Sequence, residues 1–453
     1  MKDYKGMNVL ILGFGKSGEE SFKFLLKRGA TITVSDVNEN IIVPDEYLKE
    51  NVKFVFGPHK VEDFINKDMI VVSPGVSWDV EPLRVAREKG IRVIPEVQLA
   101  YENIKGNIIG ITGSNGKSTT AALVHKILNY SGIPAFLAGN IGYPLVSFVD
   151  KSSEKDLIVT ELSSFQLEGI ENFRIKLSSI LNITPDHLDR HRSFEEYVMA
   201  KKRIFLFQTK EDFSLFNSDD PVSFSLSKES RAKLMMFSRE RVVEYGSFVR
   251  KEKIIFSDGI KEREIITIKE IPLKGIHNLE NVLAAVPISA LFVDDDEKIR
   301  NAIADFRGLE HRMEFVDEIN GVEFYNDSKA TNVDAALKSL QSFEKKVVAI
   351  LGGRDKAGDF TKLRETVRGS TKAIILIGEA RDKIRKALNG TTSFFEGTSM
   401  DEAVEKAYEL SLPGDVVLLA PACASFDMFK NFEDRGMKFK ESVFKLKRRG
   451  KTF

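Results

Sequence analysis

The residues most able to do chemistry form a glycine-rich turn that ends in a lysine, at positions 110–117. The segment reads Gly-Ile-Thr-Gly-Ser-Asn-Gly-Lys and lies between a strand expected at 108–112 and a helix expected at 117–130. Backbone amides at the start of such a helix bind phosphate, while Lys117 would neutralise the β and γ phosphates and Ser118 would bind magnesium. Isoleucine at 111 departs from the usual pattern and disfavours an ordinary GTPase or motor ATPase. The turn therefore predicts an ATP-consuming enzyme.

Two polar segments follow later strands and could complete such a site. Glu161 comes directly after a strand expected at 157–160, and His187 lies in a polar loop after a strand expected at 179–181. Ligands of α/β proteins bind at the carboxyl ends of strands, and magnesium prefers oxygen ligands. Glu161 is therefore a candidate magnesium ligand, weighed against a glutamate that only faces solvent or caps a helix. His187 is a functional candidate because its loop is polar rather than apolar.

A second glycine pattern lies near the N-terminus. Gly13, Gly15 and Gly18 follow the first expected strand, at 8–12, and Asp36 ends the next one. This is the spacing of a dinucleotide-binding turn, in which glycines allow a tight turn, close approach of phosphate and helix packing. The ligand stays open, because NAD and a UDP-sugar share a diphosphate and a ribose. A plain structural turn, an oxidoreductase and a UDP-binding domain all fit this pattern alone.

Composition limits the class of protein. The 453 residues are 42% hydrophobic and 30% charged, and 67 basic side chains balance 67 acidic ones. This balance disfavours nucleic-acid and membrane-surface binding, and the short apolar run at 9–12 is too short for a signal peptide or a membrane span. The single cysteine, Cys423, excludes an internal disulfide and a multi-thiolate metal site, and we assign it no catalytic role. We expect a cytoplasmic protein that binds neither nucleic acid nor membrane.

The alternation of strand-like and helical segments predicts the fold. Strands separated by helices favour parallel sheets with right-handed crossovers, so we predict an α/β protein of three domains. These are a Rossmann-like domain at 1–104, a central P-loop ATPase-like domain at 105–308 and a C-terminal Rossmann-like domain at 309–453. Short alternating segments at about 212–271 predict a small β excursion at the edge of the central sheet. Further strands are expected at 31–35, 54–56, 69–72, 92–94, 253–256, 264–268, 323–325, 346–351, 373–377 and 416–419.

Taken in order, the motifs resemble the Mur ligase family over nearly the whole chain. Beyond those already quoted, the resemblance rests on Gly139-Asn140-Ile141-Gly142, Glu161-x-Ser-Ser-Phe-Gln, Asn182-x-x-x-Asp-His187, His277-Asn278-x-x-Asn281, Glu310-His311-Arg312, the run 326–332 (Asn-Asp-Ser-Lys-Ala-Thr-Asn), Gly352-Gly353 and the run 422–427 (Ala-Cys-Ala-Ser-Phe-Asp). Within the family, the Ser114-Asn115 form of the turn, the run 326–332 and the segment 425–436 are most similar to the member that adds D-glutamate. The alanine-adding member usually has histidine where Asn115 stands, and the Asp-Asn-Pro-Arg motif of the diaminopimelate-adding member is not found. A sister ligase stays the main alternative.

The resemblance implies an amide-forming reaction of peptidoglycan precursor synthesis. ATP would phosphorylate the carboxylate of UDP-N-acetylmuramoyl-L-alanine, and D-glutamate would attack the acyl phosphate, releasing ADP and phosphate. The resemblance also implies ATP and two magnesium ions, a carbamate formed from CO₂ on Lys201, and a monomer. An NAD-dependent oxidoreductase would leave the phosphate turn unused. A nucleotide-switched binding module would leave His187, Lys201 and the third domain without a role.

The same resemblance assigns residues to four overlapping sets. The catalytic set is Lys117, Glu161, His187 and Lys201, and the metal set is Ser118, Glu161, His187 and carbamylated Lys201. The ATP set is Gly113, Ser114, Asn115, Gly116, Lys117, Ser118, Thr119, Asn278, Asn281, Arg312 and Asp327. The set for the UDP-linked substrate is Gly15, Lys16, Ser17, Asp36, Val37, Gly75, Asn140 and His187. The D-glutamate set is Lys329, Thr331, Lys356, Ser425 and Phe432.

Overall fold

The computed structural model describes residues 2–187, 190–273, 275–355 and 358–449. The chain forms two compact units, Met1–Phe306 and Arg307–Phe453, each described here by itself. Within the described residues the first unit holds a five-stranded and a nine-stranded sheet, and the second holds a six-stranded sheet. The predicted α/β fold with three sheets is confirmed, whereas the boundaries at 104 and 308 stay a prediction.

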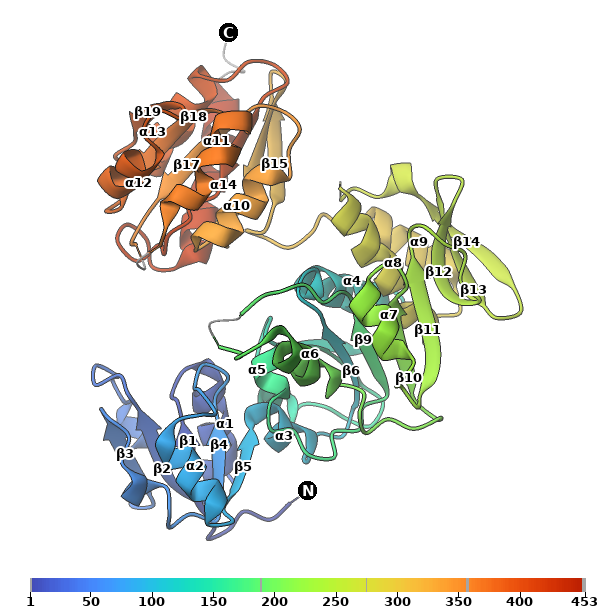
Figure 1. Cartoon of the computed structure of the whole chain (residues 1–453), viewed down its shortest axis with the longest axis vertical. Coiled ribbons are helices and arrows are strands. Elements are labelled where there is room, and N and C mark those ends of the chain that lie inside the picture. Colours follow the sequence, from blue (N-terminus) through green and yellow to red (C-terminus); the bar gives the residue numbers. More distant parts are fainter. Residues whose placement is uncertain (1, 188–189, 274, 356–357, 450–453) are drawn as a thin grey trace. The chain divides into compact units, whose positions relative to one another are not determined.

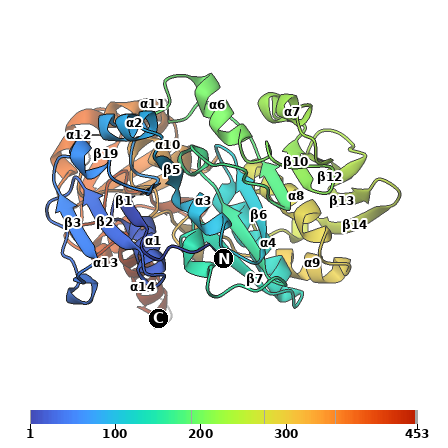
Figure 2. The same cartoon turned by 90° about the horizontal axis from the view of Figure 1, so that it is seen from below.

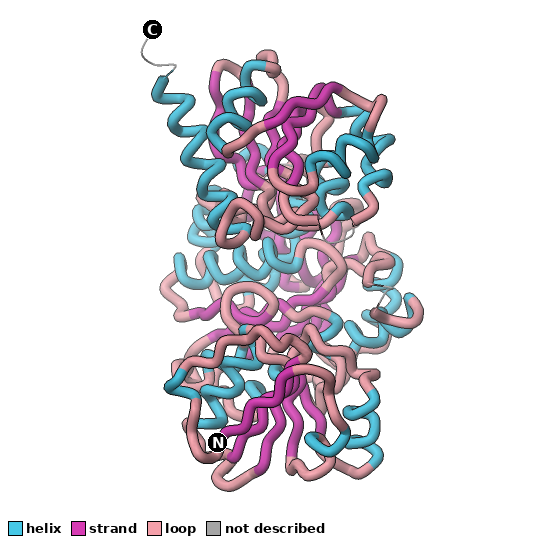
Figure 3. The backbone as a smooth tube through the Cα atoms, turned by 90° about the vertical axis from the view of Figure 1, so that its left-hand side faces the viewer, coloured by secondary structure: helices cyan, strands magenta, loops and turns pink. Residues whose placement is uncertain are grey.

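The first sheet is entirely parallel, in the order β3-β2-β1-β4-β5. Its central strands are continuously apolar and buried, because helices cover both faces of the sheet, as Figures 1 and 3 show. This arrangement confirms the predicted doubly wound sheet. Its elements are β1 (Asn8–Leu12), α1 (Lys16–Leu26), β2 (Thr31–Asp36), β3 (Val52–Phe56), β4 (Met69–Val72), α2 (Glu81–Glu88), β5 (Arg92–Pro95) and α3 (Glu96–Tyr101).

The nine-stranded sheet has a parallel part and an antiparallel edge. Strands β7, β8, β6, β9, β10, β11 and β12 are parallel neighbours, and β13 and β14 continue the sheet antiparallel. Its elements are β6 (Asn107–Thr112), α4 (Lys117–Tyr130), β7 (Ala135–Gly139), β8 (Leu157–Glu161), α5 (Ser164–Leu167), β9 (Leu177–Ile180), α6 (Phe194–Lys202), β10 (Phe213–Asn217), α7 (Pro221–Ser227), β11 (Lys233–Ser238), β12 (Tyr245–Arg250), β13 (Lys253–Asp258), β14 (Glu262–Thr267), α8 (Ile276–Ala290) and α9 (Asp296–Ala304).

The β excursion predicted at the edge of this sheet is present as β12, β13 and β14 (Figure 2). Strands β10 and β11, which lie in the same stretch of sequence, instead extend the parallel sheet. The hairpin between β12 and β13 turns at Lys251 and Glu252, which have φ values of 49° and 58°. A two-residue loop with both central residues left-handed is a type I′ turn, whose twist matches that of the strands.

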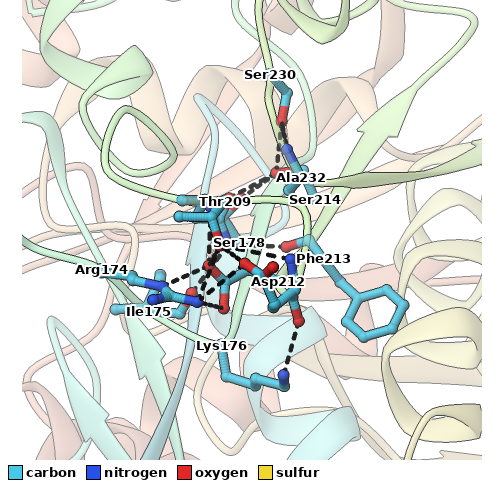
Figure 4. Close-up of polar contacts among 12 residues, drawn as sticks. Arg174, Ile175, Lys176, Ser178, Thr209, Asp212, Phe213, Ser214, Ser230 and Ala232 are labelled. Atoms are coloured by element: carbon cyan, nitrogen blue, oxygen red, sulfur yellow. Dashed lines mark hydrogen bonds and ion pairs between the residues drawn. The ribbon is translucent and has the colours of Figure 1, made fainter.

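A polar network joins β9 to β10 and to the segment that precedes β10 (Figure 4). The hydroxyls of Ser178 and Ser214 both donate to Gln208 Oε1, whose amide donates to two backbone carbonyls. Beside it, Arg174 pairs with Asp212 at 2.7 Å. Because the side chains of these residues are bonded to one another, we interpret the network as structural rather than as a ligand site.

The second compact unit holds a mixed six-stranded sheet in the order β15-β16-β20-β17-β18-β19, with only the edge strand β15 antiparallel. Separate apolar cores fill its two faces. The elements are β15 (Glu314–Ile319), β16 (Val322–Asn326), α10 (Val333–Gln341), β17 (Val347–Gly352), α11 (Arg364–Ser370), β18 (Thr371–Ile377), α12 (Arg381–Leu388), β19 (Ser393–Glu396), α13 (Met400–Glu409), β20 (Val416–Leu419) and α14 (Phe432–Arg449). None of the described helices in either unit is both long and apolar enough to cross a membrane.

Candidate active site

The phosphate turn joins β6 to α4, as predicted. Gly113 and Gly116 have φ values of 157° and 83°, and Gly116 is the residue that precedes the helix. A Cβ atom at Gly116 would lie 2.2 Å from Asn281 Oδ1, so a side chain there would collide with α8. Thr120 Oγ1 also donates to Asn281 Oδ1, at 3.3 Å, and Asn281 Nδ2 donates to Asn278. The predicted adenine-binding asparagines therefore lie directly behind the phosphate turn.

Lys117 is folded over the turn that precedes it. Its Nζ donates to the carbonyl oxygens of Gly113 at 2.9 Å and Ser114 at 3.0 Å. The ammonium is thus held on the turn, beside the amides at the start of α4 that could bind phosphate. This position suits the predicted role of neutralising phosphate charge.

Three predicted residues converge at the carboxyl ends of β7 and β8. Ser118 Oγ donates to Glu161 Oε2 at 2.7 Å, and Asn140 Nδ2 donates to Glu161 Oε1 at 2.9 Å. Glu161 is 1% exposed. The described residues contain no group of three or more His, Cys, Asp or Glu side chains that could hold a metal ion. A hydroxyl and a carboxylate at one point still fit magnesium, which takes few protein ligands and completes its shell with phosphate and water.

Lys201 is buried at the end of α6, with 1% of its surface exposed. Its Nζ donates to Gly113 O at 2.8 Å and lies 4.6 Å from the centre of the Tyr197 ring. Burial lowers the pKa of this amine well below its ordinary value, and the ammonium of Lys117 lowers it further. The carboxylates of Asp186 and Glu161 oppose the shift, which also indicates that they are near. Burial and the neighbouring cation thus both make the charged form of this amine less favourable than in water.

His187 lies in the loop that follows β9, as predicted, and is exposed. Its φ of 54° is unusual for a non-glycine residue. The Phe165 ring, four residues beyond Glu161, packs edge-on against the imidazole at 4.9 Å between centroids. The segment that carries Glu161 and the loop that carries His187 are therefore in contact through Phe165.

The phosphate turn is held in place by residues to which the sequence analysis gave no role, although Asn182 lies in one of the quoted motifs. Asn182 Oδ1 accepts from the amide of Asn115 at 2.8 Å, and Thr184 exchanges two hydrogen bonds with the Ser114 hydroxyl. The Tyr197 hydroxyl lies 3.0 Å from the same Ser114 oxygen. Tyr197 precedes Lys201 by four residues, so both lie on one face of α6. That spacing is the signal from which Tyr197 could have been found.

In the N-terminal sheet, the glycine turn has the predicted geometry. A Cβ atom at Gly18 would lie 1.9 Å from Gly13 O, so α1 can approach the turn only with glycine there. Asp36 accepts the amide of Phe14 at 2.7 Å and therefore fixes the turn. Lys16 Nζ donates to Gly142 O at 2.6 Å, next to Asn140 in sequence. This bond links the predicted UDP site to the segment that contacts Glu161.

In the second unit, the predicted D-glutamate residues lie on neighbouring segments. Lys329 Nζ lies 4.1 Å from the centre of the Phe432 ring. Ser425 is buried, Thr331 is half-buried, and Lys356 lies outside the described residues. Asp327, predicted to contact ATP, is 6% exposed and accepts from Ser339 and from the amide of Met313. Burial raises the pKa of the Asp327 carboxyl, with the Ser339 hydroxyl acting in the opposite direction.

Arg435 is a fully buried residue of this region that sequence reasoning did not single out. Its guanidinium donates to Ser328 Oγ at 3.0 Å, Ser328 O at 2.9 Å and Cys423 O at 3.1 Å. It therefore ties together the segments that carry Lys329 and Ser425, and it does so from the first turns of α14. Cys423 is itself buried, and burial raises the pKa of its thiol to about 12, which fits a residue without a catalytic role.

The other predicted residues lie on loops or helix starts. Gly15, Lys16, Val37 and Gly75 are exposed at the carboxyl edge of the first sheet. Ser17, Thr119 and Arg312 are partly exposed. A polar pocket of about 200 Å³ lies in the first compact unit. Residues 77–79 and Glu168, Arg190, His191, Arg192 and Glu196 line it. None of the residues predicted for ATP, the precursor or metal lines it.

Models of protein families match three successive parts of the chain. The "Mur ligase MurD-like, N-terminal domain" matches residues 7–95, the "Mur ligase middle domain" matches 111–288, and the "Mur ligase, glutamate ligase domain" matches 311–423. The three matches fall on the three sheets in turn.

Curated relatives match over nearly the full length. A protein of Acidobacterium capsulatum named UDP-N-acetylmuramoylalanine--D-glutamate ligase is 46% identical over 97% of each chain, and one of the same name from Koribacter versatilis is 44% identical over 98% of each. Among solved structures, the UDP-N-acetylmuramate-alanine ligase of Thermotoga maritima aligns with a TM-score of 0.58 at 17% identity, covering 97% of this chain and 100% of that one. At this identity the likeness shows the fold alone. From its relatives and from the three domain models, we conclude that the chain belongs to the Mur ligase family.

Proposed function

We propose that the protein joins D-glutamate to UDP-N-acetylmuramoyl-L-alanine, using ATP and an acyl-phosphate intermediate, in the synthesis of peptidoglycan precursors. The observation that carries the proposal is the convergence of Lys117, Ser118, Glu161 and Lys201 around one phosphate turn. Full-length relatives of that name support the choice of substrates. We place the protein in the cytoplasm as a monomer, with domains at 1–104, 105–308 and 309–453.

The reaction needs a carboxylate to become an electrophile, because a free carboxylate resists attack by an amine. Transfer of the terminal phosphoryl group of ATP to a carboxylate oxygen gives an acyl phosphate, and the amine of D-glutamate then displaces phosphate to form the amide. The chain's own task is to align the reactants and to stabilise negative charge. Lys117 and the amides at the start of α4 would hold the phosphates, and Asn278 and Asn281 the adenine. Arg312 and Asp327 would also contact ATP.

Ser118 and Glu161 are the residues that would hold magnesium, with His187 assisting a second ion. Magnesium bound there would neutralise phosphate charge and bring two anionic reactants together. Asn140, already bonded to Glu161, would place the precursor beside this point. The exposed carboxyl edge of the first sheet, with Gly15, Lys16, Ser17, Asp36, Val37 and Gly75, would bind the UDP part. Lys329, Thr331, Lys356, Ser425 and Phe432 would bind D-glutamate.

We further propose that Lys201 is a carbamate in the active enzyme. The neutral amine nitrogen would bond to the carbon of CO₂ and release one proton to solvent, which leaves an anionic carbamate. Starting from the ammonium, a second proton is released when the neutral amine forms, so a cation is replaced by an anion overall. Only a neutral amine can react in this way, and burial next to Lys117 favours the neutral form. A carbamate would also turn the repulsion between Lys201 and Lys117 into attraction and add an oxygen ligand for magnesium.

The proposal is tested by measuring ADP release with the UDP-linked precursor and each of D-glutamate, L-glutamate, L-alanine and diaminopimelate in turn. We expect turnover with D-glutamate only, and turnover with another amine instead would identify a sister ligase.

Lys117→Ala should lower the rate by about 10²–10³-fold because it removes charge stabilisation in the transition state. Lys126→Ala, on the same helix, should retain activity since Lys126 pairs with Asp305 on the surface. If turnover instead required a nicotinamide cofactor and released no ADP, the alternative function as an NAD-dependent oxidoreductase would be favoured.

A further inference from the structure

Arg190 joins two segments that the proposed mechanism uses separately. Its Nη2 donates to the carbonyl oxygen of Val76 at 2.6 Å and lies 3.3 Å from Glu168 Oε2. The guanidinium also lies over the Phe165 ring, 4.8 Å from its centre. Only 17% of the side chain is exposed. One arginine therefore bridges the loop after β4 of the first sheet and the segment after β8 of the second.

The first end of this bridge belongs to the turn that carries Gly75. Val76 N donates to Ser73 O at 3.0 Å, which closes the turn, and Ser73 Oγ donates to Gly13 O at 2.8 Å. A Cβ atom at Gly13 would lie 2.9 Å from a methyl group of Val76. The turn thus packs directly on the N-terminal glycine turn. Through its bond to Val76 O, Arg190 is therefore connected to the proposed precursor site.

The second end of the bridge belongs to the loop that carries His187. The amide of Arg190 donates to His187 O at 3.0 Å, and Phe165 contacts both side chains. His191 strengthens the same anchor, because its Nε2 lies 2.9 Å from Ser164 Oγ and its ring stacks on Phe165. The left-handed conformation of His187 is unfavourable for a non-glycine residue and persists only where the surroundings impose it.

From this geometry we infer that Arg190 is a positioning residue that couples the precursor-binding turn to the placement of His187. The inference rests on the proposed function, since it takes Gly75 to contact the precursor and His187 to assist magnesium. Binding of the nucleotide-linked precursor at the turn would favour the conformation of the loop in which His187 faces the phosphates. Glu168 supports the bridge by holding the guanidinium in place.

Arg190→Met tests the coupling, because it removes the donors but keeps much of the apolar stem. We expect the KM of the UDP-linked precursor and the magnesium concentration for half-maximal rate to rise about tenfold each, with the KM of ATP at saturating magnesium unchanged. Calorimetric binding of the precursor alone should weaken by a similar factor. Arg190→Lys, which keeps the charge but not the planar fork, should lie between the two.

Arg192→Met is the matched control. Arg192 borders the same pocket, but its side chain is 71% exposed and pairs with Asp79, whose side chain is 64% exposed. It should behave as the wild type in all three measurements. If Arg190→Met loses its folded structure in thermal unfolding, Arg190→Lys and Glu168→Gln carry the same test.

A double-variant cycle separates coupling from simple support of the fold. If Arg190 acts through His187, adding Arg190→Met to His187→Ala should leave the magnesium requirement of His187→Ala unchanged. Wild-type constants in Arg190→Met, or fully additive effects in the double variant, would overturn the inference. If His187→Ala alone does not alter the magnesium requirement, the role proposed for His187 fails instead, and the coupling to it fails with it.

Discussion

Lys201 in the first compact unit and Arg435 in the second are both almost completely buried. The two cations differ in the number of hydrogen-bond acceptors around them and in how strongly burial lowers their pKa. Lys201 donates to Gly113 O at 2.8 Å and to Thr112 Oγ1 at a longer 3.5 Å, and it faces a second cation. Arg435 distributes three hydrogen bonds over a hydroxyl and two carbonyl oxygens. Burial lowers the pKa of Arg435 only to about 10, so the guanidinium stays charged at neutral pH.

The difference shows what each buried cation can contribute. An amine whose pKa is lowered by burial gives up its proton more readily and is then a nucleophile, which suits the carbamate proposed on Lys201. A guanidinium that stays charged is suited to hold backbone carbonyls in place, so Arg435 is a positioning residue for the segments around Ser328 and Cys423.

The largest effect is expected for Lys201→Ala. If the modified side chain organises the magnesium site, its loss should lower the ADP-forming rate by about 10²–10³-fold. Acetate or propionate added to the variant should partly restore the rate by supplying the missing carboxylate, whereas Lys201→Arg should show no rescue. In the wild type, intact-mass measurement should detect one CO₂ increment that is lost on acid treatment.

Lys202→Ala is the control for this prediction, because Lys202 is the neighbouring lysine but pairs with Glu229. It should retain activity and CO₂ dependence. If neither the mass nor the activity of the wild-type protein responds to CO₂, the proposed carbamate on Lys201 is contradicted.

A smaller effect, mainly on stability and on one substrate, is expected for Arg435→Met. The variant leaves Ser328 O and Cys423 O without their donor, which costs about 1–3 kcal/mol for each buried carbonyl. Chemical unfolding should report a loss of about 2–6 kcal/mol, and the KM of D-glutamate should rise while that of ATP does not. Lys438→Met, on the exposed side of α14, should change neither, since Lys438 pairs only with Glu441 in the described structure. A rise in both KM values would instead point to general damage.

The smallest effect concerns a buried anion, Glu96, which extends the comparison to the opposite charge. Glu96 is 1% exposed, accepts the amide of Val146, and has one oxygen without a partner in the part of the chain described. Burial raises the pKa of this carboxyl to about 7, with the Val146 amide opposing the shift. A raised folded pKa means that stability is full below the unfolded value of about 4.5 and falls as pH rises through about 7.

The free energy of unfolding should therefore decrease by about 3 kcal/mol between these pH values, relative to a variant that cannot ionise. Glu96→Gln is that variant, and denaturant titrations at several pH values should show a flatter profile for it. Glu88→Gln, on the exposed end of α2, should follow the wild type. Parallel profiles for Glu96→Gln and wild type would mean that the carboxyl does not stay protonated on folding.

Much of the fold could be predicted from the sequence because apolar strands and glycine turns leave strong local signals. The strands at 8–12 and 69–72 and the helix at 117–130 were predicted with the bounds that the structure has. Strands such as β15 and β19 were missed, since they are edge strands with exposed, mixed composition. Edge strands depend on pairing with a neighbour more than on their own pattern.

The candidate site was predicted in part for the same reason. Lys117 and Ser118 begin α4 and Glu161 ends β8, each within a motif, and the structure joins Ser118 to Glu161 and folds Lys117 over the phosphate turn. Tyr197 was missed although its four-residue spacing from Lys201 on α6 was a local signal. Arg190 and Arg435 were missed because each acts through long-range contacts, to Val76 and Ser328 respectively. Such contacts have no periodicity or spacing in the sequence, and only the folded chain reveals them.

The hairpin turn at Lys251 and Glu252 offers a separate practical use. Two long charged side chains occupy backbone conformations that Asn and Gly adopt with far less strain. The turn lies between β12 and β13, at the antiparallel edge, and none of the residues proposed for catalysis belongs to it. Replacing Lys251 and Glu252 by Asn and Gly would be a route to a more stable catalyst for industrial or screening work. The residues proposed for catalysis would stay unchanged.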